Sequence, residues 1–537
     1  MCCIGSSIGL PLSKLMAPTV FMVTSPTKTK TNTRACVLHS IRQTPFFNTA
    51  MPDSHESQSL SNETKTCDPQ KLTLSQMFDM AGTGYDGPHL QCVDDNDALI
   101  FRDGNLVCGS LEALVQHLLP TRDYYPDRTY VFAFLLGSRL FTKPQDLFSQ
   151  ICQICICQQN LGHDRVKKES LGRFGPNFVR LLSHWTDLYP HDFLDERMQK
   201  TLKDISQRIV TVYPELRKEV ANIMQNLYNE LNGLKVFDDY MSKVNAESLQ
   251  KSQNQMVPTT DIIDVCPDPL TLAQQLTNVE LDRFSHIGAE EFVCACVKDS
   301  INGNCTGTSS TSHLEIYIQW FNRLSYFVAT EICSHLKKKK RVCMIDYFID
   351  VAKECINIGN FNSLVAIIAG MNMSPVARLK KTWAKINKDK FSILEHQMDP
   401  TNNFSSYRLC LKAAKWRSEG AVDDRERVIV PFFSLFVKDI YFLNEGFSNR
   451  MPNGNINFEK FWLLAKRLSE FVSWQKVECP YAKKTDILSY ILTTPIYSET
   501  ALLLASFECE GPETSHEKEK YKQLADKGRH KQMKMQT

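Results

Sequence analysis

The 537-residue sequence contains no run of about 18 consecutive apolar residues, so it predicts no membrane-spanning helix. It also lacks an excess of charge of either sign, because 62 Lys and Arg residues stand against 60 Asp and Glu residues. A net charge near zero excludes a global electrostatic argument for binding nucleic acid or an anionic membrane, so only local patches could supply one. The remaining composition is typical of globular proteins, and the length predicts more than one domain.

The N-terminal segment lacks acidic residues, since Asp53 is the first Asp or Glu of the chain. This composition resembles an organelle transit peptide, but its apolar stretch, 15–23, is short and is interrupted by proline. We therefore interpret residues 1–96 as a disordered leader, with a targeting signal as the alternative. Cys2 and Cys3 lie beside this basic segment and could be acylated, because stable membrane attachment needs two anchors. Unmodified, disordered cysteines are the alternative.

Common catalytic motifs are absent: there is no Gly-rich phosphate loop of the Walker type, no HExxH and no Gly-x-Ser-x-Gly. Cysteine is abundant, with 19 residues. The odd count and the apolar surroundings predict reduced, largely buried thiols of a cytosolic protein. Cys152, Cys155 and Cys157 include a Cys-x-x-Cys spacing, but a zinc site normally needs a second pair, and none lies nearby. We interpret these cysteines as core residues and expect no metal ion.

Helical periodicity dominates the sequence from residue 97 onward. Asp103-Gly104-Asn105 predicts a turn, and Ser110 predicts the N-cap of a helix that Pro120 ends. The apolar face of this helix has the spacing i, i+3, i+4, i+7 and i+8: Leu111, Leu114, Val115, Leu118 and Leu119. Similar patterns continue to residue 512, and alternation typical of strands is scarce. The sequence therefore predicts an all-α fold.

Polar segments divide and end this helical sequence. Residues 239–260 are rich in Ser, Asn, Gln and Lys, which predicts a linker between two domains. In the second domain, Thr277 is expected to cap a helix. The basic run at 337–341 is expected in an exposed loop between helices, with a lipid or nuclear-import contact as the alternative. Residues 513–537 predict a polar basic tail, either a frayed helix or a disordered end.

Several strings in the second domain resemble the catalytic domain of Ras guanine nucleotide exchange factors, and they follow the order found in that family. The strings are LAQQLT at 272–277, NFNSL at 360–364, GMNMSPVARLKKTW at 370–383, VPFF at 430–433, NEG at 444–446, INFEK at 456–460 and FVSWQ at 471–475. Residues 110–119 and the string YPDRTY at 125–130 resemble the N-terminal Ras exchanger motif that accompanies this domain. The whole chain is similar to the Ras-GEF domain-containing protein family 1.

The resemblance implies a helical N-terminal Ras exchanger motif domain at 97–238 and a larger catalytic domain at 261–512, with a protruding helical hairpin at about 431–475. It implies guanine nucleotide exchange on a Ras-family small GTPase, Rap-type first and Ras second. The hairpin would open the first switch of the GTPase and release GDP, and the nucleotide-free GTPase would be bound most tightly. No covalent bond changes and no cofactor is needed. An exchange-inactive scaffold that binds a GTPase is the alternative.

The same resemblance implies a monomer in the cytoplasm, with peripheral membrane contact where its lipid-anchored GTPase resides and without nucleic acid as a partner. Tyr441 and Glu445 lie four residues apart and so share a helix face. By resemblance this face points at the magnesium and α-phosphate site of the GTPase, where Tyr441 would exclude the metal and Glu445 would repel phosphate. The alternative for Glu445 is an ordinary solvent-facing position.

Asn372 is implied to contact the GTPase near the base of the hairpin and to help fix its second switch, with a purely structural amide as the alternative. The other residues implied to bind the GTPase are Phe432, Val365, Asn403, Phe404 and Ser374. Core packing is the alternative for Phe432 and Val365. Ser312, Leu463 and Asn444 replace residues that are frequent in relatives, which bears on the choice of GTPase more than on activity.

Overall fold

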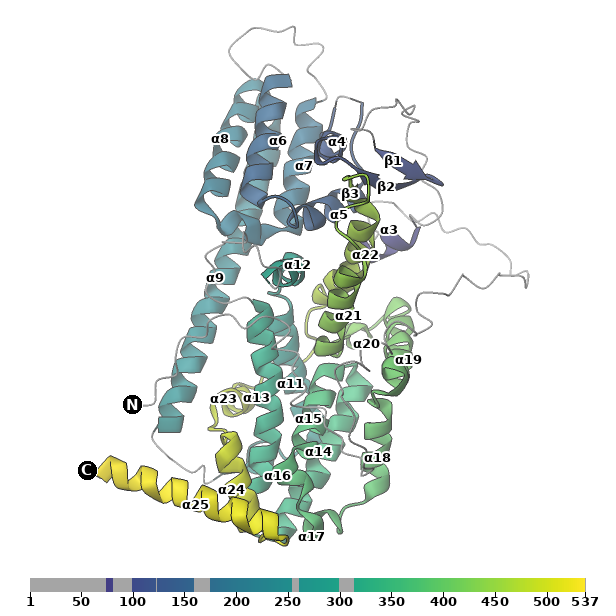
Figure 1. Ribbon diagram of the computed structural model, residues 1–537. Helices are drawn as coiled ribbons and strands as arrows, with labels where there is room; N and C mark the ends of the chain where they lie inside the picture. The colour runs from purple at the N-terminus through teal and green to yellow at the C-terminus, as the bar shows by residue number, and fades with distance from the viewer. Residues whose placement is uncertain are drawn as a thin grey trace. The chain divides into compact units, whose positions relative to one another are not determined.

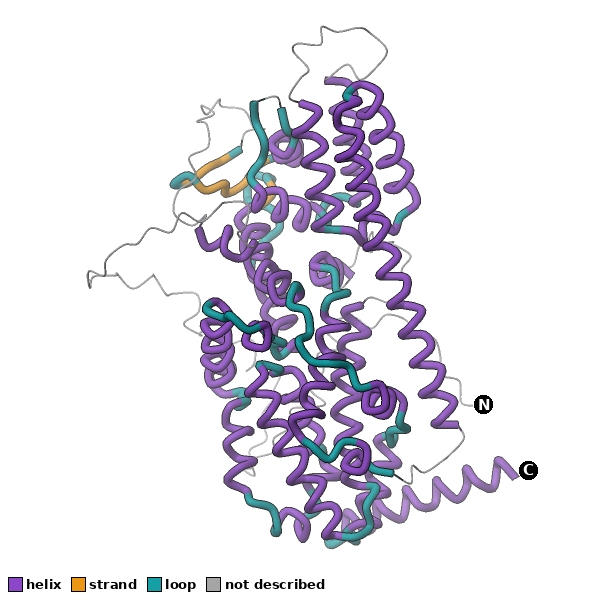
Figure 2. The backbone as a smooth tube through the Cα atoms, turned by 180° about the vertical axis from the view of Figure 1, so that it is seen from behind, coloured by secondary structure: helices purple, strands orange, loops and turns teal. Residues whose placement is uncertain are grey.

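The computed structural model describes residues 74–80, 99–121, 123–158, 174–253, 260–298 and 313–536. These residues are helical almost throughout, in agreement with the predicted all-α class (Figures 1 and 2). Within them, no helix combines the length and apolar character that crossing a membrane requires. The leader up to residue 73, the proposed acylation sites Cys2 and Cys3, and Ser312 lie outside the described residues.

The N-terminal domain consists of helices and one β-hairpin. Its elements are α3 (Leu74–Met80), β1 (Ile100–Arg102), β2 (Asn105–Gly109), α4 (Leu111–Leu118), α5 (Arg128–Ser138), α6 (Pro144–Gln158), α7 (Phe174–Leu188), the 3-10 helix η4 (Pro190–Leu194), α8 (Glu196–Val212), the 3-10 helix η5 (Pro214–Leu216) and α9 (Arg217–Gln253). Asp103 and Gly104 have φ of 50° and 77° and form the turn between β1 and β2, as predicted. Ser110 Oγ accepts a hydrogen bond from Ala113 N at 3.1 Å and so caps α4, also as predicted.

Helix α3 corrects part of the predicted leader, because residues 74–80 are ordered. Leu74 and Phe78 lie four residues apart and are both buried. The ring of Phe78 lies 4.7 Å from that of Trp462 and 6.1 Å from that of Phe132, measured between centroids. Two apolar residues at helical spacing therefore hold this turn of helix to the domain, although its neighbours in sequence are polar.

Helix α9 corrects the predicted linker, because it runs without interruption through residues 239–253. Its buried stripe includes Phe237 and Met241, while most of the polar side chains that suggested a linker face solvent. Lys251 Nζ reaches the larger domain and donates a hydrogen bond to Thr493 Oγ1 at 2.6 Å. A helix that buries only one narrow stripe has the composition of a linker.

The larger domain is helical, and a two-residue strand interrupts it. Its elements are α10 (Ile262–Val265), α11 (Pro269–Phe284), α12 (Ala289–Lys298), α13 (His313–Cys333), α14 (Lys338–Ile358), α15 (Phe361–Asn372), α16 (Ser374–Ala377), α17 (Lys380–Trp383), α18 (Lys388–Gln397), α19 (Thr401–Glu419), α20 (Asp424–Arg427), α21 (Phe433–Gly446), β3 (Ile456–Asn457), α22 (Phe458–Gln475), α23 (Thr485–Thr493), α24 (Glu499–Cys509) and α25 (Ser515–Gln536). Asp268, not Thr277, caps α11, and Thr277 is buried within that helix.

The basic run at 337–341 is also not an exposed loop, because α14 starts within it. Arg341 is buried and donates hydrogen bonds to the carbonyls of His335 and Leu336 at 2.9 and 2.7 Å. The Glu510 carboxylate lies 3.4 Å from the Arg341 guanidinium. One member of the run is therefore a structural residue, which a count of charges could not distinguish from its exposed neighbours.

The predicted tail forms α25, whose first turn is attached to the larger domain. Arg378 Nε donates to Glu517 Oε1 at 3.1 Å, and the ring of Tyr521 lies 5.5 Å from that of Phe507. The order of this segment therefore extends at least to residue 521, in agreement with the predicted helix alternative rather than the disordered one.

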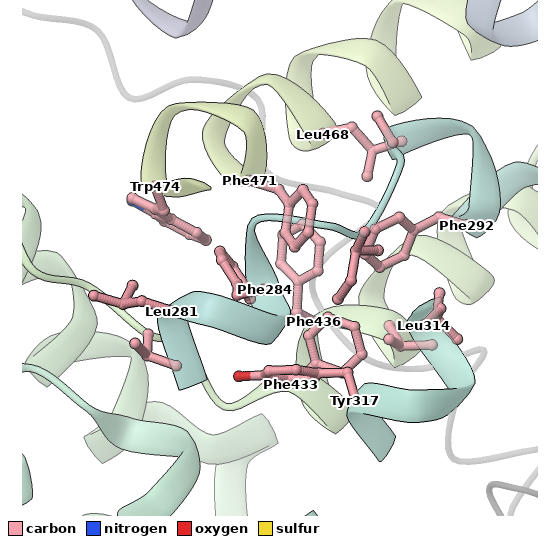
Figure 3. Close-up of a cluster of buried hydrophobic side chains, with 14 of the residues drawn as sticks. Leu281, Phe284, Phe292, Leu314, Tyr317, Phe433, Phe436, Leu468, Phe471 and Trp474 are labelled. Carbon is pink, nitrogen blue, oxygen red and sulfur yellow. The ribbon is translucent and has the colours of Figure 1, made fainter. Parts of the chain in front are cut away.

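A cluster of buried, largely aromatic side chains lies where five helices of the larger domain meet (Figure 3). The residues labelled there come from α11, α12, α13, α21 and α22: Leu281, Phe284, Phe292, Leu314, Tyr317, Phe433, Phe436, Leu468, Phe471 and Trp474. The ring centroid of Phe471 lies 4.5 Å from that of Phe284 and 4.9 Å from that of Phe292. Because each ring buries a large apolar area, this cluster fixes α21 and α22 to the rest of the domain.

A buried carboxylate also makes the stability of this domain depend on pH. Glu331 of α13 accepts hydrogen bonds from Ile262 N at 3.0 Å and from Tyr490 Oη at 2.8 Å. Burial raises the pKa of Glu331 from 4.5 to about 7. The folded protein therefore holds a proton that the unfolded chain releases between these two values. The free energy of unfolding must fall as the pH rises through this window.

We predict that Glu331→Gln removes this pH dependence. Between pH 4.5 and about 7, the wild-type protein should lose about 3 kcal/mol of unfolding free energy that the variant keeps, since one pKa unit corresponds to about 1.4 kcal/mol. Denaturant unfolding at a series of pH values measures the difference. Glu508→Gln, at an exposed position of α24, is the control and should follow the wild type. Parallel curves for wild type and Glu331→Gln would contradict the prediction.

Candidate functional site: a helical hairpin held by both domains

Helices α21 and α22 form the hairpin that the sequence predicts (Figure 1). They run antiparallel, because the start of α21 meets the end of α22 and the end of α21 meets the start of α22. The Phe436 and Trp474 rings lie 6.1 Å apart at the first of these contacts. Lys460 Nζ donates to the Asn444 carbonyl at 2.6 Å at the second.

A buried carboxylate network holds the base of the hairpin. Glu280 of α11 is fully buried, and its carboxylate accepts hydrogen bonds from Tyr317 Oη at 2.5 Å and from Ser363 Oγ at 2.7 Å. Asn362 Nδ2 donates to the same carboxylate at 3.1 and 3.2 Å. Asn362 Oδ1 in turn accepts from Phe433 N, the first residue of α21, at 3.3 Å. The hairpin therefore starts at a point defined by three other helices.

Desolvation raises the pKa of Glu280, although its hydrogen bonds oppose that shift. Glu280 is not among the residues predicted above for the site. A signal was present, because a carboxylate among Leu276, Val279 and Leu281 occupies the apolar side of a helix and needs partners there. The NFNSL string supplies two of them, Asn362 and Ser363, so part of the family signature is a structural network.

The N-terminal domain holds the second half of the hairpin. Strand β3 pairs antiparallel with β2, with Cys108 opposite Asn457 and Gly109 opposite Ile456. The ring of Phe458 stacks on that of Tyr130 at 5.1 Å, and Phe461 packs directly against the backbone of Gly137 in α5. The INFEK string thus connects the hairpin to another domain.

Lys460 joins the ends of the two hairpin helices. Its ammonium is buried and donates to the carbonyls of Asn444 and Phe447 at 2.6 and 3.0 Å and to Asn449 Oδ1 at 2.5 Å. The Lys460 ammonium supplies hydrogen bonds to carbonyl groups that have no partner within α21. Its positive charge also interacts favourably with the negative C-terminal end of the helix dipole. These hydrogen bonds hold the last turn of α21, and with it the backbone of Glu445, in place.

Tyr441 and Glu445 lie on α21 as predicted, and Glu445 is exposed while Tyr441 is partly buried. Asn444 Nδ2 donates to Glu445 Oε1 at 3.2 Å. Asn444 thus places a neutral amide beside Glu445. The roles of Tyr441 and Glu445 toward a GTPase stay predictions.

Asn372 and Ser374 lie on the surface where α15 ends and α16 begins. Asn372 Nδ2 donates to Glu395 Oε1 of α18 at 2.8 Å, so its side chain is oriented by a second helix. Glu395 had no recognisable signal in the sequence. The structure places Asn372 at the far end of α15 from the Asn362 network, about 15 Å along the helix at 1.5 Å per residue.

Three of the residues implied to bind a GTPase are buried: Phe432, Val365 and Phe404. The rings of Phe404 and Phe432 lie 5.8 Å apart, and Phe432 N donates to Tyr407 Oη at 2.9 Å. Their burial supports the packing alternative given above for Phe432 and Val365. Contact with a GTPase stays a prediction for all three.

Asn403 is exposed and belongs to a strained turn at the start of α19. Asn402, Asn403 and Phe404 have φ of 50°, 56° and 59°, a region that L-residues rarely occupy. Arg408 Nε donates to the Asn403 carbonyl at 2.9 Å, and its guanidinium forms a bidentate pair with Asp439 of α21 at 2.8 and 2.9 Å. The hairpin and this turn are therefore connected by one arginine, which the sequence analysis did not identify.

Cysteine does not form the site. Cys152 and Cys155 are buried on α6, and burial raises the pKa of Cys155 to about 12. Such thiols are unreactive core residues, as the sequence analysis favoured. Among the described residues, the one group of side chains with metal-ligand spacing is His191, Glu291 and His313, outside the predicted exchange site.

Comparisons with known proteins match segments in each of the two domains described above. A RasGEF domain model matches residues 271–462, and a RasGEF N-terminal motif model matches residues 105–207. Ras-GEF domain-containing family member 1B of Xenopus tropicalis is 52% identical over 468 residues, which cover 85% of this chain and 98% of that protein. The chain belongs to the Ras-GEF domain-containing family. Human member 1B is 51% identical over 467 residues, with 85% and 98% covered, and member 1C of Macaca fascicularis is 50% identical over 424 residues, with 79% and 91% covered.

Both matched segments lie inside the two domains that the sequence predicts. A RasGEF domain in a member of this family identifies a guanine nucleotide exchange factor whose partner is a Ras-family small GTPase. The strings that carried the resemblance now divide into two groups. NFNSL and INFEK hold the hairpin in place, whereas GMNMSP and NEG place polar side chains on the surface.

We predict that Asn362→Leu destabilises the larger domain. It removes the amide from the Glu280 carboxylate and from Phe433 N, which leaves buried polar groups unpaired at about 1–3 kcal/mol each. Denaturant unfolding should show a loss of at least about 2 kcal/mol. Asn357→Leu, at an exposed position of α14, is the matched control and should change stability by less than about 0.5 kcal/mol. Equal stabilities of the two variants would show that the network is dispensable.

We predict that Gly137→Ala separates the hairpin from the N-terminal domain. A Cβ atom at Gly137 would overlap the ring of Phe461, so that α5 and α22 must move apart at a cost of about 1–3 kcal/mol. Gly233→Ala in α9 is the control, because no atom lies within 4 Å of its added Cβ. This control should be neutral or more stable by about 0.5–1 kcal/mol. Thermal unfolding compares the two, and a stable Gly137→Ala variant would contradict the prediction.

Proposed function

We propose that this protein accelerates GDP release from a Ras-family GTPase by inserting its hairpin at the first switch. The observation that carries the proposal is that both ends of α22 and the start of α21 are held by other helices and by β2. An exchange factor can open a switch only by binding the open form more tightly than the closed one. A hairpin fixed at its base and along its second helix is already ordered before the GTPase binds. Little of the binding free energy is then spent on ordering or bending the hairpin.

The exposed carboxylate of Glu445 supplies the chemical part of the proposal. It lies on the last turn of α21, and the Asn444 amide and the Lys460 ammonium fix this end of the helix. A carboxylate close to the phosphates of a bound nucleotide repels them, and the repulsion grows as water is excluded. Tyr441, one turn earlier, occupies volume on the same face where the metal ion of the nucleotide would lie.

A Rap-type GTPase is the preferred substrate in this proposal, and Ras is the second. The preference rests on subfamily resemblance. Leu463 and Asn444 lie on the two hairpin helices, where a difference between family members can change selectivity without loss of the fold.

The test is release of a fluorescent GDP analogue from purified Rap and Ras proteins with the full chain. The full chain is required, because α22 packs against α5 and α3 of the N-terminal domain. Faster release from at least one GTPase is expected, with Rap above Ras. Unchanged release from every client would refute exchange activity. Retained binding to nucleotide-free GTPase in that case would identify the scaffold alternative.

We predict that Glu445→Ala and Asn372→Ala each slow exchange roughly tenfold or more, the effect of losing an interaction of about 1.4 kcal/mol or more at a contact site. Both side chains are exposed, so folding should be preserved, and circular dichroism checks this. Glu508→Ala, an exposed glutamate of α24, is the control for a general effect of charge. Wild-type rates in both site variants would remove the two residues from the site.

A further inference from the structure

Three potential metal ligands meet where the N-terminal domain contacts the larger domain. They are His191 of η4, Glu291 of α12 and His313 of α13, and one ligand atom of each lies within 4.8 Å of the other two. His313 Nδ1 and Glu291 Oε1 are 3.4 Å apart. A tetrahedral site with metal–ligand distances of about 2.1 Å has ligand atoms separated by roughly 3.4 Å. This pair therefore already has the spacing of two zinc ligands.

A second carboxylate lies beside each histidine. His313 Nε2 is 3.2 Å from Asp238 Oδ1 of α9, and His191 Nδ1 is 3.0 Å from Glu290 Oε1. Metal-binding histidines almost always have this arrangement, in which a carboxylate at one ring nitrogen orients the other nitrogen toward the ion. For His313 the ring presents Nδ1 to Glu291, and for His191 the nitrogen that remains is Nε2.

One ligand nitrogen of the cluster has no hydrogen-bond partner among the described residues. His191 Nδ1 is paired with Glu290 Oε1 at 3.0 Å, whereas His191 Nε2 is buried and forms no hydrogen bond within the described part of the chain. Buried polar groups of native proteins are rarely left in this state. A cation near His191 would offset that cost.

The local charge also favours a cation. Glu290, Glu291 and Asp238 bring three carboxylates to the cluster. The nearby Arg139 donates from Nη2 to both carboxylate oxygens of Asp192, at 2.7 and 2.6 Å, so its charge is already matched. Two imidazoles and a carboxylate, with carboxylates behind them, are a ligand set typical of zinc.

We propose that His191, Glu291 and His313 bind one Zn²⁺ ion, with water in the fourth position, and that the ion connects the two domains. One ligand comes from the N-terminal domain and two from the larger domain, so binding requires the domains to be docked. An ion bound only by the docked form stabilises that form. The role is structural and independent of the exchange reaction.

The experiment uses the full chain after removal of metal ions with a chelator. Zn²⁺ is added during calorimetric titration, and the unfolding temperature is measured with and without the ion. Bound Co²⁺ should give the visible absorption of a four-coordinate ion without the near-ultraviolet bands of thiolate ligands, which separates this site from binding by cysteines. His191→Gln and His313→Gln should each lose one equivalent of Zn²⁺ and the associated rise in unfolding temperature.

Two further variants make the result specific. His286→Gln is the matched control, because His286 stacks on Phe237 at 3.9 Å and its Nδ1 lies 2.7 Å from the Asp282 carbonyl, outside the ligand set. It should keep the bound equivalent. Asp238→Asn changes a half-exposed side chain behind His313 and should weaken Zn²⁺ binding about 10–100-fold. Equal Zn²⁺ binding by wild type, His191→Gln and His313→Gln would overturn the proposal, as would absence of binding by the folded wild type.

Discussion

The carboxylate of Glu280 is buried away from solvent, and the groups that satisfy it determine where the hairpin begins. An unpartnered charge in this position would cost several kcal/mol, so the fold must bring donors to it. Tyr317, Asn362 and Ser363 do so from two other helices. Because Asn362 Oδ1 also accepts a hydrogen bond from Phe433 N, the start of α21 is positioned by the same network that satisfies the Glu280 carboxylate. The aromatic cluster around Phe471 then stabilises this arrangement by burying apolar area.

The two domains share the task of holding the hairpin. The larger domain fixes its base through Glu280, and the N-terminal domain fixes its second helix through Tyr130, Gly137 and β2. Helix α9 continues from the N-terminal domain along the larger domain and contacts it at Thr493. The N-terminal domain is therefore part of the structure that positions the hairpin. The polar side chains proposed to act on a GTPase lie at the ends of helices that these contacts orient.

Local signals in the sequence predicted local structure well. The Asp103-Gly104 turn, the Ser110 cap and the all-α class needed only nearby residues. Features that depend on distant partners could not be predicted in this way. The order of α3 depends on Trp462, the burial of Arg341 depends on Glu510, and His191 and His313 meet although 122 positions separate them. The family resemblance identified the strings, but only the structure distinguishes those that support the hairpin from those that place polar side chains on the surface.

The pairing of β3 with β2 fixes the register of the residues that lead into α22. Ile456 is buried opposite Gly109, and Asn457 caps α22 through a hydrogen bond from Lys460 N at 3.3 Å. Because side chains alternate between the two faces of a strand, a one-residue shift of this pairing would exchange these two positions. The apolar Ile456 and the polar Asn457 are both buried, so each would then lie in surroundings suited to the other, and α22 would lose its cap. A strand of the N-terminal domain thus determines which residue of the hairpin connection begins the second helix.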